Sequence, residues 1–413
     1  MRVFHVAPTR LSESSAAWRI MNAQRRIGID AEALVHVSGL ETPHTLYFPG
    51  KKNPIVNQYK INSKLNAILT RIANSGKPAL PWSYNVFSFM NLKVLNNENY
   101  DIINLHWIPS VGNLDLLSKL GKPIVITPHD VWPLTGGCHC NLECENWESG
   151  CFKCPQNHAS LIKTLSPHNS WNEKKKQYER IENLSIAAPS QWIANMAARS
   201  PLFENRKIAV TPNCVDPAEF PLRNKVFSKK VLGLDADKKH LLFVTSGYLS
   251  QFHKGLDLLQ TILVEFEKLF DFKNLEVLLV GKQSERFKYE SKISMKFLGE
   301  ITSASKMSEI YASTDVVVSC SRQDNLPSVL IEASMSGVAC VAFDVGGIGE
   351  IIEDGKNGYL IEKGDVNGFV NRIALELKLP RAPEEIRNLA ISRFAPEVSA
   401  AQYFNLYTDI LKD

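Results

Sequence analysis

The amino-acid sequence predicts an α/β protein built from two doubly wound parallel sheets. Short apolar runs rich in β-branched residues, such as 315–320 and 338–343, have the length and composition of buried parallel strands. These runs alternate with amphipathic helical segments, which is the pattern of β-α-β units. The pattern begins near the N-terminus and begins again near residue 240, after a proline-rich connection at 212–221. Each half of the chain is therefore expected to form its own sheet.

Length and composition agree with two globular domains. The chain has 413 residues, of which 44% are hydrophobic and 22% charged, as is usual for soluble proteins. No window approaches the roughly 18 apolar residues of a membrane span. The N-terminus runs directly into a predicted strand at residues 2–7 instead of a signal peptide. We therefore expect a cytoplasmic protein.

The net charge is only +4, but it is unevenly distributed, because basic residues outnumber acidic ones in the first hundred residues. Such a surface either meets an anionic partner, for example a bilayer or a phosphate-bearing acceptor, or is a solvated face without a partner. No recognised nucleic-acid motif accompanies the charge, so no nucleic-acid partner is expected.

In the first half, a strand at 2–7, a helix at 14–27 and a strand at 31–37 open the sheet. Residues 40–99 are interrupted by prolines and are expected to form loops and short helices. Further strands are predicted at 101–106, 122–127, 184–188 and 208–211, with helices within 160–182 and from 189 onward. The carboxyl ends of parallel strands line the ligand crevice of such a sheet. His106 and His129 both follow strand ends, although a histidine at such a place is more often structural.

The second half begins with a strand at 240–246, followed by a loop with Gly247 and Lys254 and a helix at 256–270. A strand, a glycine-containing loop and a helix form phosphate-binding architecture, and lysine suits it as a point charge. Further strands are predicted at 275–281 and 296–299, followed by a helix at 303–313.

The stretch 319–358 carries most of the chemistry. After the strand at 315–320 the chain turns, and Pro327 falls where the first residue of a helix at 327–335 is expected. Three side chains in this turn could supply an oxygen that caps the first helical amides: Asp324, Asn325 and Ser328. A strand, a tight turn and a helix N-terminus make a natural anion site, because free amides and the helix dipole point at one place.

Two acids in this stretch are eight residues apart: Asp324 before the helix and Glu332 within it. They are placed to hold hydroxyl groups on either side of a bound phosphate. From the spacing alone, a capping Asp and a Glu on a helix face are an equally good explanation.

These residues resemble the donor-binding signature of retaining glycosyltransferases of family 4. The family motif is Glu-x7-Glu with a trailing Gly-Gly-x-x-Glu, which stands here as Asp324-x7-Glu332 followed by Gly346, Gly347 and Glu350. Asp in place of the first Glu, within Asp-Asn-Leu-Pro, is typical of a subgroup that resembles bacterial exopolysaccharide and colanic-acid-type enzymes. The resemblance extends over nearly the whole chain.

The resemblance implies the GT-B fold, in which two Rossmann-like domains face each other across a cleft. The first domain would comprise residues 1–210, on the acceptor side, and the nucleotide-sugar-binding domain residues 211–390. Helices are also predicted at 366–377, 383–391 and about 396–411. The last of them, within the C-terminal segment 391–413, would in this fold cross back to the first domain.

The resemblance also implies an activity of the hexosyltransferase class, in which a sugar moves from a UDP- or GDP-linked donor to an acceptor hydroxyl with retention. The candidate catalytic residues are His129, Asp324 and Glu332, where Asp324 would hold sugar hydroxyls, Glu332 the ribose, and His129 the sugar from the facing domain. The remaining candidate donor-binding residues are Gly247, Lys254, Asn325, Leu326, Pro327, Ser328 and Glu350. No catalytic metal is expected, and Lys254 and the helix amides would stabilise the leaving diphosphate.

The sequence departs from the family pattern in two places. The first loop, residues 10–16, is rich in serine where a Gly-Gly turn is common, and Tyr248 stands near the position of a diphosphate-binding arginine, for which Lys282 or Arg322 could compensate. A non-catalytic sugar-nucleotide-binding paralogue or partner subunit is therefore an alternative. A nicotinamide-dependent oxidoreductase is disfavoured, because no Gly-x-Gly-x-x-Gly follows either first strand.

Five of the eight cysteines lie in the loop 136–157, and four of them have the spacing Cys138-x5-Cys144-x6-Cys151-x2-Cys154. Four thiolates match the tetrahedral ligand set of structural zinc. Free or redox-active thiols are an alternative, and disulfides are disfavoured in a reducing cytosol. The loop resembles one in the same subgroup, where its role would be structural.

The biological setting follows from family analogy only. It implies assembly of a bacterial surface polysaccharide, with a saccharide or lipid-linked saccharide as acceptor and peripheral contact with the inner membrane. The donor sugar, its base and the acceptor are not specified by these residues.

Overall fold

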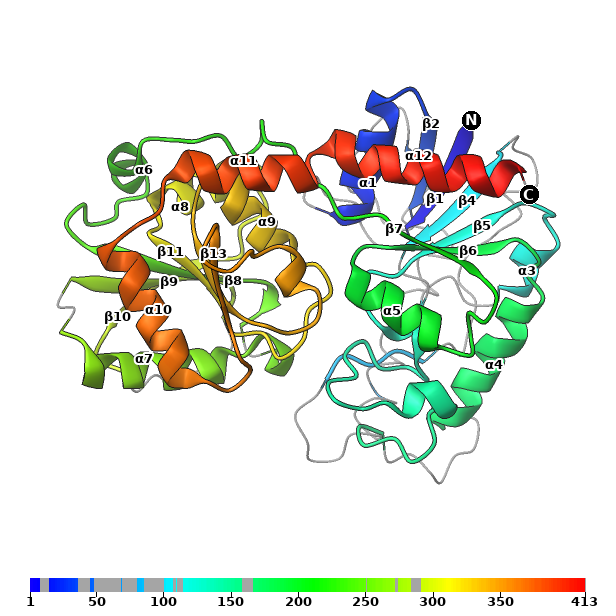
Figure 1. Ribbon diagram of the computed structural model, residues 1–413, viewed down its shortest axis with the longest axis horizontal. Coiled ribbons are helices and arrows are strands. Elements are labelled where there is room, and N and C mark those ends of the chain that lie inside the picture. Colours follow the sequence, from blue (N-terminus) through cyan, green and yellow to red (C-terminus); the bar gives the residue numbers. More distant parts are fainter. Residues whose placement is uncertain are drawn as a thin grey trace. The chain divides into compact units, whose positions relative to one another are not determined.

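The computed structural model describes two compact α/β units (Figure 1). The first unit comprises Met1–Asn213 and Ser399–Asp413, and the second comprises Cys214–Val398. The residues that the structure describes are 1–7, 15–35, 45–47, 68, 80–84, 100–106, 109, 114–157, 166–249, 251–271, 274–283 and 291–412. Most of the predicted acceptor-side segment 40–99 and most of the serine-rich first loop lie outside these residues.

Within its described part, the first unit contains a seven-stranded parallel sheet with the order β3-β2-β1-β4-β5-β6-β7. Its strands are β1 (Arg2–Ala7), β2 (Asp30–Val35), β3 (Thr45–Tyr47), β4 (Ile102–His106), β5 (Ile124–Thr127), β6 (Leu184–Ala188) and β7 (Lys207–Val210). The chain moves outward from β1 to β3 and then returns to β4 on the other side of β1. The point at which the strand order reverses therefore lies between β1 and β4, where ligands of open α/β sheets bind.

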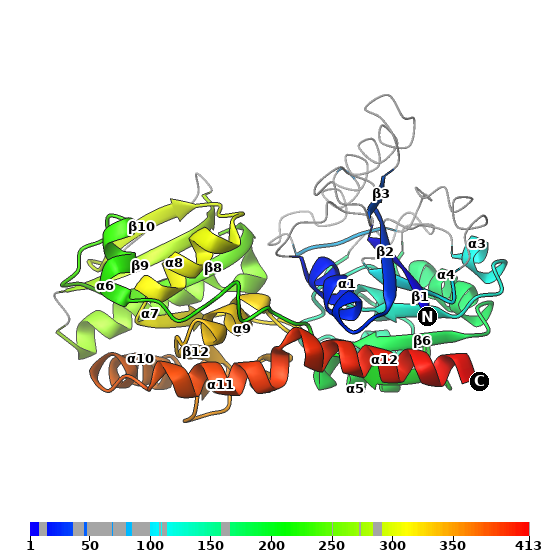
Figure 2. The same ribbon diagram turned by 90° about the horizontal axis from the view of Figure 1, so that it is seen from above.

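Alternation along the strands divides the core of the first unit into two layers. Val3 packs with Ile20 of α1 and Tyr407 of α12, whereas its neighbour Phe4 packs on the opposite face with Ile193 of α5. Figure 2 shows α1 and α12 beside the sheet. The helices are α1 (Ala16–Arg26), α3 (Asp115–Ser118), α4 (Pro167–Glu179), α5 (Gln191–Arg199) and α12 (Pro396–Lys412), with short 3-10 helices η3 (Trp132–Leu134) and η4 (Asn146–Ser149).

The second unit, as far as it is described, contains a six-stranded parallel sheet with the order β10-β9-β8-β11-β12-β13. Its strands are β8 (Lys239–Tyr248), β9 (Leu275–Lys282), β10 (Ser294–Gly299), β11 (Val316–Ser319), β12 (Cys340–Phe343) and β13 (Gly358–Ile361). The strand order reverses between β8 and β11. The predicted strands at 240–246, 275–281, 296–299 and 315–320 are thus confirmed, with small shifts of their ends.

Helices cover the second sheet, with α7 packed against α10 and α9 packed against α11. The helical segments are α6 (Lys225–Val231), η6 (Phe252–Lys254), α7 (Leu256–Leu269), α8 (Ala304–Ser313), α9 (Ser328–Met335), η7 (Ile348–Glu350), α10 (Val366–Lys378) and α11 (Pro383–Phe394). No helix among the described residues is both long and apolar enough to cross a bilayer.

One expected helix boundary differs in the structure. Pro327 precedes α9 as its N-cap residue, with an extended ψ of 112°, so that Ser328 is the first helical residue. The helices predicted at 383–391 and from about 396 are confirmed as α11 and α12, with an interruption at Ala395. Pro396 explains this interruption, because a proline disfavours the helical conformation of the residue before it, and Ala395 is extended with ψ 152°.

Candidate active site

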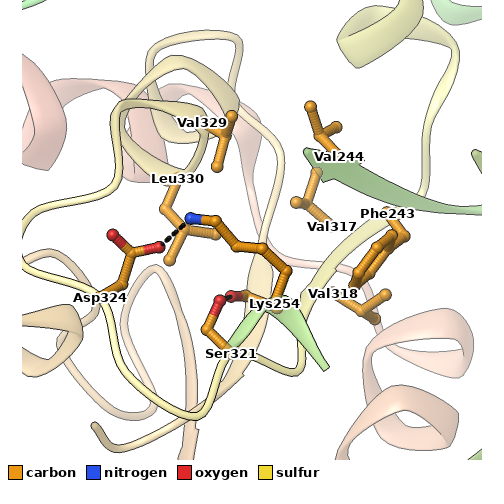
Figure 3. Close-up of a pocket in the computed structure, with 10 residues that line it drawn as sticks. Phe243, Val244, Lys254, Val317, Val318, Ser321, Asp324, Val329 and Leu330 are labelled. Atoms are coloured by element: carbon orange, nitrogen blue, oxygen red, sulfur yellow. Dashed lines mark hydrogen bonds and ion pairs between the residues drawn. The ribbon is translucent and has the colours of Figure 1, made fainter. Parts of the chain in front are cut away.

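A pocket lies at the switch point of the second sheet, where β8 and β11 are adjacent (Figure 3). Apolar residues of the two strands line one side, among them Phe243 and Val318. Polar side chains from the following loops line the rest, including Lys254, Ser321 and Asp324. Val329 and Leu330, at the start of α9, complete the lining. The pocket thus has an apolar wall and one strongly charged corner.

The charged corner is an ion pair between Lys254 and Asp324. The Lys254 Nζ atom lies 2.6 Å from Asp324 Oδ2, and the two side chains are only 19% and 18% exposed. Lys254 ends η6 in the loop after β8, and Asp324 lies in the loop after β11. Figure 3 shows the ammonium group directed at the carboxylate. Two residues that the sequence predicts as donor-binding are therefore brought together, and limited solvent exposure strengthens their attraction.

Two glycines permit the backbone approach that forms this corner. Gly255, which follows Lys254, has a φ of +74°, and a Cβ atom there would collide with the carbonyl oxygen of Cys320. Gly346 has a φ of +62°, and its Cβ would collide with the carbonyl oxygen of Asp324. That same oxygen accepts a hydrogen bond of 3.0 Å from the Gly347 amide. The Gly-Gly turn therefore supports Asp324 through its backbone.

Arg322 has a different role from the one considered in the sequence analysis. Its guanidinium group donates to both carboxylate oxygens of Asp257, at 2.8 and 2.6 Å, and to the Phe252 carbonyl at 2.7 Å. This hydrogen bonding holds the pKa of Asp257 below its usual range. Arg322 therefore braces the Lys254 loop from outside the pocket lining. Lys282, the other candidate, lies 3.2 Å from Glu300 and is likewise absent from the lining.

The N-terminus of α9 has no side-chain cap among the described residues. The predicted capping by Asp324, Asn325 or Ser328 is therefore wrong: Asp324 Oδ1 instead accepts from the Asn325 amide at 3.1 Å. The first amides of a helix have no intrahelical acceptors, so an uncapped N-terminus can bind an anion. Val329 and Leu330 of this first turn line the pocket beside Lys254. Asn325, Leu326 and Pro327 are buried, and Ser328 is half-buried.

Glu332 is buried, and it has a partner that sequence reasoning missed. The hydroxyl of Tyr311, on α8, donates a 3.0 Å hydrogen bond to Glu332 Oε2. A buried tyrosine on an amphipathic helix looks like a core residue in sequence, so only the fold reveals this contact. Glu350 lies in η7 and is half-buried. The carbonyl oxygen of Gly247 accepts a hydrogen bond of 3.0 Å from the Thr245 hydroxyl. Glu332, Glu350 and Gly247 are thus three predicted site residues that are not part of the pocket lining.

In the first unit, the predicted histidines meet at the switch point between β1 and β4. His106 Nδ1 lies 2.9 Å from His129 Nε2, and His106 Nε2 lies 2.9 Å from Nδ1 of His5. Burial lowers the pKa of His5 and of His129 to about 4, so both rings are neutral at pH 7. Sequence reasoning missed His5, which lies within a strand and was counted as core.

Asp130, next to His129 in the chain, belongs to a separate cluster. Its Oδ2 atom lies 2.8 Å from His139 Nδ1, and its Oδ1 accepts from the Trp132 amide at 2.8 Å. The adjacent His-Asp pair in the sequence is thus not a hydrogen-bonded pair in the structure.

The cysteine loop gathers the four predicted thiols. Cys138, Cys144, Cys151 and Cys154 lie close enough to influence one another electrostatically. Burial raises the pKa of Cys151 to about 12 and also raises that of Cys138 and Cys154, so these groups are protonated thiols at neutral pH. Over the described part of the chain, however, no three His, Cys, Asp or Glu side chains are arranged to hold a metal ion.

A buried lysine supports the same loop. Lys174 of α4 is 2% exposed and donates to the carbonyl oxygens of Trp132 and Thr135, at 2.5 and 2.6 Å. Burial lowers the pKa of Lys174 to about 7. Cys151 Sγ in turn accepts from the Gly136 amide at 3.1 Å, so the loop is tied to its own backbone and to α4.

Two parallel-sheet α/β domains define the GT-B class of fold. The chain superposes on sucrose-phosphate synthase from Thermosynechococcus elongatus with a TM-score of 0.68 and 15% identity, covering 100% of this chain and 99% of that one. It superposes on Anabaena HepE in complex with UDP and glucose with a TM-score of 0.63 and 16% identity, covering 99% and 100%. At these identities the likeness shows the GT-B fold alone.

Two family models match, one in each half of the chain. Residues 43–219 match the model "Glycosyltransferase Family 4", and residues 238–378 match "Glycosyl transferases group 1". Both halves are therefore similar in sequence to glycosyltransferase domains.

Several curated proteins are similar to parts of this chain. N-acetyl-alpha-D-glucosaminyl L-malate synthase of Bacillus anthracis is 29% identical over 222 residues, 51% of this chain and 55% of that protein. D-inositol 3-phosphate glycosyltransferase of Arthrobacter sp. strain FB24 is 25% identical over 278 residues, 64% of this chain and 59% of that protein. WcaC of Escherichia coli strain K12, named for colanic acid biosynthesis, is 23% identical over 335 residues, 76% of each. The match thus spans little more than half the length of the first two relatives.

Proposed function

We propose that this protein moves a sugar from a nucleotide diphosphate donor, linked to uridine or guanosine, to an acceptor hydroxyl with retention at the anomeric carbon. The observation that carries the proposal is the partly buried Lys254–Asp324 pair at the switch point, beside the uncapped N-terminus of α9. The complexes of Anabaena HepE with UDP and glucose and with UDP-glucose support a nucleotide-sugar donor.

The chemistry follows from charge. When the glycosidic bond of the donor breaks, negative charge develops on the leaving diphosphate. Lys254 and the first amides of α9 supply fixed positive potential at one place, which is the largest contribution such a site can make. We expect these groups to act in place of a divalent cation, so that a chelator such as EDTA leaves turnover unchanged. Strong inhibition by EDTA, reversed by Mg²⁺, would contradict this part of the proposal.

Asp324 has two functions in this proposal. Without donor it holds the Lys254 ammonium at 2.6 Å. When the donor binds, the diphosphate shares that ammonium, and the carboxylate becomes available to sugar hydroxyls. Glu332, oriented by Tyr311, would bind the ribose, and Glu350 would support the site from the Gly-Gly turn. His129 would contact the sugar from the first domain.

A donor screen tests the proposal. Purified protein would be incubated with UDP- and GDP-linked sugars, and release of the nucleotide or sugar transfer would be measured by mass spectrometry. Lys254→Ala and Glu332→Ala should each reduce turnover severely, while Lys268→Ala, at an exposed lysine paired with Glu265, should not. Near-wild-type rates for both site variants at saturating donor would show that the site is wrongly assigned.

The acceptor and setting are proposed by analogy. Relatives named for colanic acid and amylovoran biosynthesis favour a role in bacterial surface polysaccharide assembly. The acceptor would be a saccharide or lipid-linked saccharide, reached at the cytoplasmic face of the inner membrane. Co-sedimentation with anionic vesicles tests this contact, and no binding at low salt would contradict it. The comparisons offer no support for the alternative of a non-catalytic paralogue, since the named relatives are enzymes.

For the cysteine loop we propose a structural zinc ion bound by Cys138, Cys144, Cys151 and Cys154. Four neighbouring thiols have the right chemistry, but their present arrangement means that metal binding must draw them together and deprotonate them. Protein from zinc-replete expression should contain close to one zinc per chain, and less than about 0.5 equivalent would contradict the proposal. Cys144→Ser should lower the zinc content, whereas Cys140→Ser should not.

A further inference from the structure

A continuous chain of hydrogen bonds runs through the interior of the first unit from His129 to α1. His129 Nε2 pairs with His106 Nδ1 at 2.9 Å, and His106 Nε2 pairs with His5 Nδ1 at 2.9 Å. His5 Nε2 then pairs with the amide oxygen of Gln24 at 2.9 Å. Three imidazoles, from β1, from β4 and from the segment after β5, are thus joined end to end, and Gln24 is the last member.

The far end of the chain is anchored on α12. The Gln24 amide nitrogen donates to the Tyr407 hydroxyl at 3.2 Å, and Asn104 donates to the same hydroxyl at 2.8 Å. Asn104 in turn accepts from the Thr127 hydroxyl at 2.8 Å. Since Gln24 uses its nitrogen for Tyr407, its oxygen faces His5 and can only accept a hydrogen bond.

This end group sets the direction of every hydrogen bond in the chain. A neutral imidazole has one N–H donor and one acceptor nitrogen. Because Gln24 accepts, His5 carries its hydrogen on Nε2 and offers Nδ1 as an acceptor. His106 must then donate from Nε2 and accept at Nδ1, and His129 must donate from Nε2. The only nitrogen of His129 left for a ligand is Nδ1, which bears a lone pair.

The surroundings keep the rings neutral. His5 and His106 are 0% and 1% exposed, and burial lowers the pKa of both. Asp130, the carboxylate nearest to His129, is already bound to His139 and the Trp132 amide. His129 itself is only half-buried, so part of the residue is accessible to solvent.

We propose that Gln24, His5 and His106 are positioning residues that lock His129 in the neutral Nε2–H tautomer, so that Nδ1 accepts a hydrogen bond from a ligand hydroxyl. Such a nitrogen binds a hydroxyl group and repels a phosphate oxygen, because both it and the phosphate oxygen carry lone pairs. The identity of that hydroxyl as part of the donor sugar rests on the proposed function, whereas the tautomer lock does not.

Nitrogen NMR of the full-length protein labelled with ¹⁵N-histidine tests the lock directly. Each of the three rings should show a protonated Nε2 and an unprotonated Nδ1 at pH 7, with signals assigned from His5→Gln, His106→Gln and His129→Gln. A protonated Nδ1 on His129, or averaging between the two tautomers in the wild-type protein, would overturn the proposal.

A variant then tests the coupling over the length of the chain. Gln24→Met removes the acceptor at a similar volume, and we expect His129 to show a mixture of tautomers. Turnover at saturating donor should fall about tenfold, the scale of one lost hydrogen bond. Gln191→Met, at an exposed glutamine of α5, serves as the control and should change neither quantity. An unchanged His129 tautomer in Gln24→Met would contradict the lock.

The two proposals fail in distinguishable ways. If the NMR signals show the lock but His129→Gln retains full transfer activity, the lock stands and the role of His129 in donor binding is wrong. If His129→Gln is inactive but the wild-type ring is protonated on Nδ1, the site assignment stands and the lock is wrong.

Discussion

The ammonium of Lys254 and the carboxylate of Asp324 lie 2.6 Å apart although they are separated by 70 positions in the sequence. The pair joins the loops that follow β8 and β11, on either side of the switch point of the second sheet. Arg322, in the loop after β11, also donates to the Phe252 carbonyl in the loop after β8, so the ion pair is one of several contacts that hold the two loops together.

Replacing Asp324 should separate binding of the diphosphate from catalysis. In Asp324→Asn, no carboxylate competes with the diphosphate for the Lys254 ammonium. A nucleoside diphosphate without sugar should therefore bind this variant at least as tightly as it binds the wild-type protein. Turnover of the complete donor should fall by about a hundredfold, because a group that contacts the reacting sugar is lost. Calorimetry and steady-state kinetics measure the two quantities. Diphosphate binding that weakens as much as in Lys254→Ala would contradict this explanation of the pair.

Gly346→Ala should damage the site through the backbone. The added methyl group would collide with the Asp324 carbonyl, so Asp324 must move and donor turnover should fall at least about tenfold. Gly364→Ala is a matched control, since Gly364 also has a positive φ, of +92°, but open space around its Cβ position. Both variants should lose about 1–2 kcal/mol of unfolding free energy from the left-handed conformation. Equal turnover in the two variants would refute the close approach as a functional constraint.

Tyr311→Phe should affect Glu332 specifically. Loss of the hydroxyl leaves a buried carboxylate with one donor fewer, at a cost of about 1–3 kcal/mol of stability. The KM for the donor should rise, because Glu332 is no longer held in its orientation. Tyr178→Phe, at another buried tyrosine whose hydroxyl donates to the Pro133 carbonyl, should lose stability without any change in KM. A donor KM that is unaltered in Tyr311→Phe would mean that Glu332 does not bind the donor.

The buried histidines predict a stability that declines in mild acid. His5 and His129 have pKa values of about 4 in the folded protein, whereas an unfolded chain binds the same protons near pH 6.5. The unfolded state therefore binds more protons between pH 6.5 and 4, and the free energy of unfolding falls as the pH is lowered through this window. Each of the two histidines lowers the free energy of unfolding by about 3 kcal/mol between pH 7 and pH 4. Urea unfolding at pH 7, 5.5 and 4.5 measures this, and His5→Gln should show a shallower decline. Identical pH profiles for the two proteins would be evidence against burial of a neutral His5.

The sequence allowed prediction of strands and helices because buried parallel strands are short apolar runs between recognisable helices. It also allowed prediction of Lys254 and Asp324 as parts of one site, since both follow strands at the point where ligands bind to such sheets. The start of α9 was misplaced by one residue, because proline is compatible with both the N-cap and the first helical position.

Partners that depend on tertiary packing could not be predicted. Tyr311, His5 and Gln24 lie at positions that sequence patterns assign to the core. The hydrogen-bond partners of their polar atoms lie on other helices and strands, so these partners are known only once the fold is known. Arg322 is similar, because its charge was available in the sequence but its two-pronged contact with Asp257 requires the fold. Buried polar residues on otherwise apolar elements are therefore the main source of missed site residues in this chain.

The central claim is that the switch-point pocket of the second unit binds the diphosphate of a nucleotide sugar through Lys254. Calorimetric titration of wild-type protein and Lys254→Ala with UDP, GDP and the matching monophosphates tests it most directly. One diphosphate should bind the wild-type protein at least about tenfold more tightly than its monophosphate, and this difference should disappear in Lys254→Ala. The same preference for the diphosphate in both proteins would show that Lys254 does not bind the diphosphate.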